Sequence, residues 1–134
     1  MERHSLTVSS SRAASGEVSR WARALAERAG VAEERIDGID LCIVELVSNV
    51  VDHGYHGGAG EIGVDLALED GRAVLTVTDA AREFDPLSVA PPAVPALIED
   101  AKIGGYGVHL VRSTAARCKY ERRADRNVFT AWFD

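Results

Sequence analysis

Two stretches of the N-terminal half carry apolar residues at steps of three and four, which is the spacing of one helix face. The first stretch covers residues 11–29 and the second residues 31–53. Their apolar positions are Ala13, Ala14, Val18, Trp21, Ala22, Leu25 and Ala29, and then Ile36, Ile39, Ile43, Val47 and Val50. Gly30 and Gly54 follow these patterns, and glycine is common directly after a helix. The sequence therefore predicts two amphipathic helices, the second of which crosses the core.

Other stretches alternate apolar and polar residues, which is the pattern of half-buried strands. They are residues 62–68, 72–78, 118–123 and 127–133. The first two are separated by Asp70-Gly71, a pair that favours the positive φ angles of a two-residue hairpin turn. The last two form a second predicted hairpin around residues 124–126. A weaker alternation over residues 5–10 is consistent with an edge strand.

The prolines gather in one place between the two predicted hairpins. They are Pro86, Pro91, Pro92 and Pro95. This concentration prevents regular structure and predicts a long loop over about residues 85–104. A glycine-rich segment, residues 104–107, then begins a third predicted helix. The apolar positions of that helix are Val108, Leu110, Val111 and Ala115.

The order of predicted elements is strand, helix, helix, two strands, loop, helix, two strands. Hairpins without helical crossovers between consecutive strands indicate an α+β fold rather than a doubly wound one. We therefore expect a two-layer α/β sandwich, a mixed but mostly antiparallel sheet covered on one face by three helices. The length fits a single domain over residues 1–134.

Composition and charge exclude several classes of protein. The chain has 134 residues, 15 Lys plus Arg, 21 Asp plus Glu and a net charge of −6, which argues against nonspecific binding of nucleic acid or of an anionic membrane. Cys42 and Cys118 lie far apart, a spacing that argues against a disulfide scaffold or zinc module and favours a reducing compartment. No apolar stretch is long enough to cross a membrane. We expect a cytoplasmic protein.

The second predicted helix carries a polar face opposite its apolar one. Glu45, Ser48, Asn49 and Asp52 cluster there at about 100° per residue. A carboxylate and a carboxamide four residues apart project from successive turns, so one can accept a proton while the other offers an oxygen to Mg²⁺. A plain amphipathic helix with its polar side in water explains the same pattern.

Two further segments carry candidate chemistry. Asp79 ends a predicted strand beside the proline loop, where a carboxylate can accept a hydrogen bond from the exocyclic amine of a base. A turn aspartate explains it equally well. The segment from Gly105 to Val108 exposes backbone N–H groups at a helix start, where phosphates bind. Glycines that only begin a helix are the alternative there.

The three segments, in this order and on these elements, resemble the GHKL ATPase superfamily. Glu45 and Asn49 match its N-box, Asp79 with Phe84-Asp85-Pro86 its first glycine box, and Gly105-x-Gly107 its second. Within the superfamily the chain is most similar to the anti-sigma-factor serine kinases, whose N-box ends like His53-Gly54-Tyr55.

This resemblance implies roles for individual residues. Asn49 would coordinate a Mg²⁺ that bridges the phosphates of ATP, and Glu45 would be the general base that takes a proton from the acceptor serine. Asp79 would accept a hydrogen bond from the adenine amino group. The backbone amides of Gly105, Tyr106, Gly107 and Val108 would contact phosphates. The loop over residues 85–104 would be the ATP lid.

The sequence departs from the family pattern at two places. Ala81 stands where the family has the glycine of Asp-x-Gly, so it belongs to the expected nucleotide site. Its methyl group would crowd the adenine or require a positive φ that alanine resists at about 1 kcal/mol. In the last strand, Val128 lies about where many relatives have an adenine-side threonine, and Thr130 is left out of the site.

The resemblance implies a serine protein kinase that phosphorylates a STAS-type anti-anti-sigma protein with ATP and Mg²⁺ and sequesters a sigma factor. It also implies a homodimer. The acidic charge of the chain argues against direct binding of nucleic acid or membrane. Ala81 motivates an alternative, a non-catalytic partner-switching regulator with weakened nucleotide binding. A detached histidine-kinase ATPase domain fits less well, because the sequence shows no pair of phosphoacceptor helices.

Overall fold

The computed structural model describes residues 1–88, 111 and 114–134. In chain order the elements are β1 (Glu2–Ser9), α1 (Ala14–Arg28), α2 (Glu33–Asn49), the π-helical η1 (Val50–Gly54), β2 (Glu61–Glu69), β3 (Arg72–Asp79), the short 3₁₀ helix η2 (Pro86–Ser88), β4 (Arg117–Arg123) and β5 (Arg126–Phe133). The predicted lid beyond Ser88 and the predicted phosphate-binding residues 105–108 lie outside this description.

The strands form one sheet in the order β1-β2-β3-β5-β4. Every pairing in it is antiparallel. The predicted α+β class is therefore confirmed, but the expectation of a mixed sheet is wrong for the described strands. The reason is that β5 returns from β4 by a hairpin and inserts beside β3, so that neighbouring strands always run in opposite directions.

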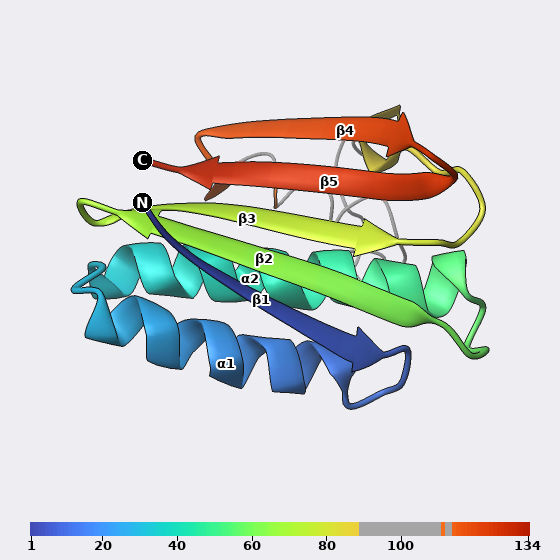
Figure 1. The fold of residues 1–134 in the computed structure, drawn as a ribbon, viewed down its shortest axis with the longest axis horizontal. Helices are drawn as coiled ribbons and strands as arrows, with labels where there is room; N and C mark the ends of the chain where they lie inside the picture. Colours follow the sequence, from blue (N-terminus) through green and yellow to red (C-terminus); the bar gives the residue numbers. More distant parts are fainter. Residues whose placement is uncertain (89–110, 112–113) are drawn as a thin grey trace, which may run out of the picture.

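Both described helices lie side by side on one side of the sheet (Figure 1). The strands bury alternate residues against them, as Ile62, Val64, Leu66 and Leu68 of β2 do. This period of two leaves the other residues of each strand on the open face. Two of the three predicted covering helices are thus confirmed. Of the third, Val111 is fully buried, and its carbonyl oxygen accepts a 3.0 Å hydrogen bond from the N–H of Ala115.

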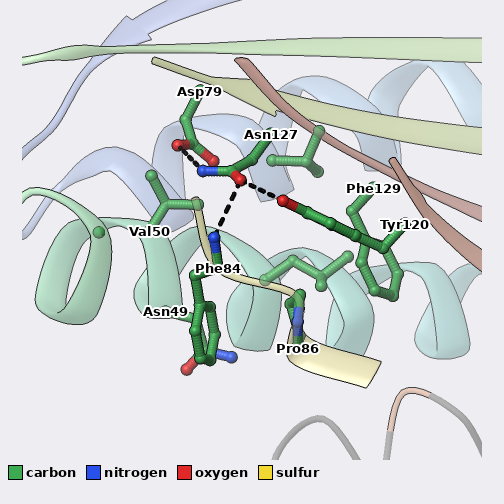
Figure 2. A pocket seen from close by; sticks show the side chains of 11 residues that line it. Asn49, Val50, Asp79, Phe84, Pro86, Tyr120, Asn127 and Phe129 are labelled. Carbon is green, nitrogen blue, oxygen red and sulfur yellow. Dashed lines mark hydrogen bonds between the residues drawn. The ribbon is translucent and has the colours of Figure 1, made fainter. Parts of the chain in front are cut away.

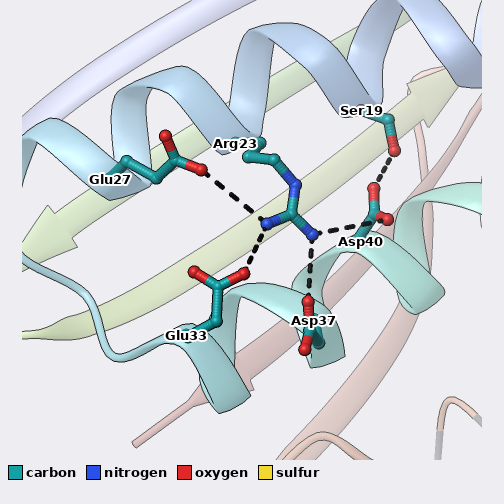
Figure 3. A network of polar contacts seen from close by, with 6 residues as sticks. All are labelled: Ser19, Arg23, Glu27, Glu33, Asp37 and Asp40. Carbon is teal, nitrogen blue, oxygen red and sulfur yellow. Dashed lines mark hydrogen bonds and ion pairs between the residues drawn. The ribbon is translucent and has the colours of Figure 1, made fainter.

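An arginine on α1 stands between the two helices. The guanidinium of Arg23 donates to Glu33 at 2.9 Å and to Asp37 at 3.0 Å, both on α2. Glu27 and Asp40 lie slightly farther from it, each at 3.8 Å (Figure 3). The guanidinium of Arg23 is therefore within ion-pair distance of four carboxylates where α1 packs against α2.

The second helix changes its winding near its end. The α-helical pattern predicted as far as His53 stops at Asn49, and Val50–Gly54 form a π-helical turn. Its bond runs from the N–H of Tyr55 to the carbonyl of Val50 at 2.9 Å. Such turns occur often at functional sites because they redirect the side chains that follow. Here the turn brings Gly54 and Tyr55 to the end of β3.

Both hairpin turns have two central residues with positive φ. These are Asp70 and Gly71, at 51° and 77°, and Ala124 and Asp125, at 50° and 63°. Positive φ at both positions defines the type I′ turn, whose twist matches that of the strands. The first predicted turn is confirmed, and the second is one residue shorter than predicted because Arg126 begins β5.

Among the described residues, no helix is both long enough and apolar enough to span a bilayer.

Candidate functional site

A small cavity of about 40 Å³ lies where α2 and η1 meet the ends of β3 and β5 (Figure 2). It is lined by Leu46, Asn49, Val50, Gly54, Val77, Asp79, Phe84, Pro86, Tyr120, Asn127 and Phe129. The wall is mostly apolar with a few polar side chains, which is the usual composition of a small-molecule site. Two of the predicted site residues, Asn49 and Asp79, therefore meet at one place from separate elements.

The predicted polar face of the second helix is divided by the structure. Asn49 lines the cavity, whereas Ser48 and Asp52 line a different hollow beside the start of α1. The division follows from geometry, because Ser48 and Asn49 are about 100° apart on a helix and cannot face the same space. Glu45 is half-buried one turn before Asn49 and does not line the cavity itself.

Glu45 has an altered acidity. Burial raises the pKa of its carboxyl above the ordinary glutamate value, because the charged form loses hydration in the protein interior. A carboxylate with a raised pKa is a stronger base once it is ionised. This side chain is therefore suited to accept a proton from a hydroxyl group.

Asp79 is held by hydrogen bonds to one of its two oxygens. Oδ1 accepts from the N–H of Ala81 at 2.9 Å and from Nδ2 of Asn127 at 2.9 Å. The residue is only 5% exposed. No described residue donates a hydrogen bond to Oδ2, so this oxygen retains its capacity to accept from a ligand in the cavity.

Asn127 was not among the predicted site residues, yet it lines the cavity and is 7% exposed. The strand register places it directly opposite Asp79. Val128, which the sequence places about where many relatives have an adenine-side threonine, pairs with Thr78 and does not line the cavity, and Thr130 pairs with Thr76. The signal that identifies Asn127 is the register between β3 and β5, which the sequence alone does not give.

Ala81 does not have the positive φ angle that the sequence raised as one possible requirement at this position. The expectation of backbone strain at Ala81 is therefore wrong. Its side chain is 6% exposed and does not line the cavity. An ideal Cβ built on Gly54 would lie 3.2 Å from the Cβ of Ala81. The alanine methyl group therefore fills the space that Gly54 leaves free and stays out of the cavity.

Tyr55 joins the end of the N-box segment to the sheet. Its hydroxyl accepts a 2.9 Å hydrogen bond from the N–H of Ala80 and donates one of 2.9 Å to the carbonyl of Glu61. A Cβ at Gly60 would lie 2.4 Å from the tyrosine ring, so only glycine fits there. Tyr55 thus fixes the distance between η1 and the segment that follows Asp79.

The cavity offers oxygen donors suited to a hard cation. Mg²⁺ prefers oxygen ligands and is usually held by one or two protein groups together with phosphates and water. The carboxamide of Asn49 supplies one such oxygen at the cavity wall. The donor chemistry therefore fits a Mg²⁺ that arrives with a phosphate-bearing ligand. The remaining predicted ligand contacts, Gly105 to Val108, lie outside the described residues.

The fold and this cavity correspond to a known class of domain. The histidine kinase-like ATPase domain family, HATPase_c_2, matches residues 8–132. The chain belongs to this family, whose description as an ATPase domain implies ATP as the ligand.

Relatives within that class are protein kinases by name. The chain is 31% identical over 116 residues to the serine-protein kinase RsbW of Halalkalibacterium halodurans, covering 80% of this chain and 67% of the relative. It is 29% identical over 94 residues to the serine/threonine-protein kinase BtrW of Bordetella bronchiseptica, covering 69% and 66%. The chain thus spans about two thirds of the length of these relatives.

A solved structure has the same fold. The crystal structure of the RsbU and RsbW domains of Rv1364c from Mycobacterium tuberculosis matches with a TM-score of 0.70 at 20% identity. The match covers 99% of this chain and 32% of the other. This likeness shows the fold. The predicted resemblance to the anti-sigma-factor serine kinases is confirmed by the family match together with the RsbW and BtrW relatives.

Proposed function

We propose that the chain is a serine protein kinase of a partner-switching system, which uses ATP and Mg²⁺ to phosphorylate a STAS-type anti-anti-sigma protein and sequesters a sigma factor. The observation that carries the proposal is the meeting of Asn49 and Asp79 at one cavity, with Glu45 one helical turn away. A hydrogen-bond acceptor for the base, an oxygen for Mg²⁺ and a general base are thereby available in and beside one cavity.

Phosphoryl transfer requires mainly positioning and neutralisation of charge. In this proposal Asp79 accepts a hydrogen bond from the adenine amino group and so orients the base. Asn49 offers its oxygen to Mg²⁺, which, when bound with ATP, offsets the charge of the phosphates. Glu45 takes the proton of the acceptor serine. The backbone amides of Gly105, Tyr106, Gly107 and Val108 contact the phosphates, a role inferred from the sequence motif alone.

The partners are inferred from the family. The relatives named above are serine or serine/threonine protein kinases, which supports a protein hydroxyl as the phosphate acceptor. The STAS protein, the sigma factor and a homodimer follow from the sequence resemblance to anti-sigma-factor kinases.

The kinase proposal is tested by incubating the chain with ATP, Mg²⁺ and each of the STAS proteins of the same organism. Mass spectrometry should find phosphate on one serine of a STAS protein. The Glu45→Gln variant should lose this transfer, whereas Glu34→Gln, an exposed glutamate on the same helix, should keep it. A wild-type chain that binds ATP with Mg²⁺ but modifies no STAS protein would contradict the kinase assignment.

The non-catalytic alternative depends on Ala81 obstructing the nucleotide, and the position of its methyl group argues against this. The methyl group of Ala81 lies against Gly54 rather than in the cavity. We therefore expect the wild-type chain to bind ATP without needing the Ala81→Gly substitution. The alternative would regain support if only that variant bound the nucleotide.

A further inference from the structure

We propose that Asn127 is a positioning residue of the nucleotide site, which sets the orientation of the Asp79 carboxylate and connects it to the segment 81–84. This inference rests on the proposed function, because it concerns how an adenine nucleotide is recognised. The side chain of Asn127 lies at the centre of a hydrogen-bond network at the cavity wall (Figure 2).

The orientation of the Asn127 amide is determined by its partners. An asparagine side chain has an accepting oxygen and two N–H donors. Its Oδ1 lies 3.2 Å from the backbone nitrogen of Phe84, which can only donate, and accepts a second bond of 2.6 Å from the hydroxyl of Tyr120. The opposite end must therefore be Nδ2, which donates to Oδ1 of Asp79 and to the carbonyl of Arg82, each at 2.9 Å. The assignment of oxygen and nitrogen thus follows from the backbone.

The network leaves one carboxylate oxygen of Asp79 available. Asn127 and the N–H of Ala81 both donate to Oδ1. Two such bonds prevent rotation of the carboxylate, so Oδ2 keeps a fixed place as an acceptor. An exocyclic amine at C6 of a purine can donate to it, whereas a C6 carbonyl would place one acceptor against another. Discrimination between adenine and guanine therefore depends on Asn127 as well as on Asp79.

The same side chain also organises the cavity wall. Asn127 binds the N–H of Phe84 and the carbonyl of Arg82, and the guanidinium of Arg122 donates to the carbonyl of Ala81 at 2.9 Å. These bonds hold segment 81–84, which carries Phe84 at the cavity. Loss of the Asn127 amide would remove one restraint from the carboxylate and two from this wall.

The decisive variant is Asn127→Asp, which keeps the size and the oxygen that faces Phe84 and Tyr120. It replaces the donor to Asp79 by a second carboxylate, and two carboxylates in contact do not both ionise readily. We expect the Kd for ATP with Mg²⁺ to rise about 30-fold or more near neutral pH, since a hydrogen bond to a charged group is lost. The ratio of variant to wild-type Kd should shrink at mildly acidic pH, where the pair shares a proton and the hydrogen bond returns.

Other charged groups near this network are Arg122 on β4 and Glu83 and Asp85 in the following segment. They are the same in both proteins, so the ratio at each pH cancels their titration and that of the ligand. Calorimetry gives the Kd values, and thermal unfolding verifies that the variant is folded.

A second variant tests the donor without adding charge. Asn127→Ala has no donor to Asp79, so it should bind ATP with Mg²⁺ more weakly than the wild type. It should also lose part of the preference for ATP over GTP.

The outcomes separate this inference from the proposed function. A wild-type chain that binds no ATP overturns the proposed function. A wild-type chain that binds ATP, with Asn127→Asp within twofold of it at every pH and an unchanged preference for ATP over GTP in Asn127→Ala, overturns the role of Asn127 alone.

Discussion

At the scale of a single residue, the burial of Glu45 and its proposed role as a general base have opposite effects on its ionisation. Burial raises its pKa and makes its ionised form costly, yet the proposed general base must be ionised to accept a proton. A carboxyl whose pKa is raised in the folded state contributes most to stability below its unfolded pKa. That contribution is lost as the pH rises through the folded pKa. Glu45 thus reduces stability at the pH where it is useful.

Replacement of Glu45 by glutamine should therefore separate activity from stability. Glu45→Gln should abolish serine phosphorylation, while its unfolding free energy at neutral pH should equal or exceed that of the wild type. In the wild type, the transfer rate should fall with decreasing pH through an apparent pKa above that of an ordinary glutamate. Denaturant unfolding and a pH–rate profile measure the two effects. A strongly destabilised Glu45→Gln would argue that the carboxylate is structural.

Gly54 and Ala81 share a space that holds one methyl group without overlap, so that methyl group should be tolerated on either residue. Gly54→Ala would bring two methyl groups to 3.2 Å, an overpacked contact that should cost about 1 kcal/mol of stability and weaken ATP binding. The double variant Gly54→Ala/Ala81→Gly should recover most of both losses. Thermal unfolding and calorimetry give the double-mutant cycle. Additive effects of the two changes would show that the side chains do not interact.

At the scale of elements, the guanidinium of Arg23 on α1 forms ion pairs that connect this helix to α2. The hydrogen bonds that the Arg23 guanidinium donates to Asp37 and Glu33 raise its pKa, so it stays charged. The same carboxylates would repel one another without it, because Glu27, Glu33, Asp37 and Asp40 converge on this point (Figure 3). The pairs are partly exposed and therefore open to screening by salt.

Arg23→Gln should lower the melting temperature of the chain at low ionic strength. Added salt should narrow the difference from wild type, because it screens the repulsion that remains. Arg28→Gln, an exposed arginine at the end of the same helix that forms no ion pair with a described residue, is the matched control and should change little. Equal effects of the two substitutions, or an effect that grows with salt, would refute the role of Arg23.

Local patterns at this scale predicted much of the fold. The two helices and both hairpins follow from spacing and from Asp70-Gly71, because these signals lie within a few residues. The π-helical turn at Val50–Gly54 did not follow, since no local signal marks it and the Tyr55 that ends it is held by hydrogen bonds to Ala80 and Glu61. Asn127 was missed for the same reason, because its place opposite Asp79 depends on pairing between distant strands. Long-range contacts thus limited the sequence-based prediction of the site.

At the scale of the whole molecule, the charge of the chain opposes its proposed ligand. The net charge is −6, so the chain as a whole does not attract a polyanion such as ATP. In the proposed function the phosphates are neutralised locally, by a Mg²⁺ that Asn49 would hold and by the backbone amides proposed at residues 105–108. Binding should therefore depend strongly on Mg²⁺.

The most direct test of the account is calorimetric titration of the wild-type chain and of Asp79→Ala with ATP in the presence and absence of Mg²⁺. We predict one ATP per chain for the wild type, tighter with Mg²⁺ than without it. Asp79→Ala should bind at least about tenfold more weakly, because it loses the acceptor for the adenine amine. A wild-type chain that gives no binding heat, or an Asp79→Ala variant with unchanged affinity, would contradict the assignment of this cavity as the nucleotide site.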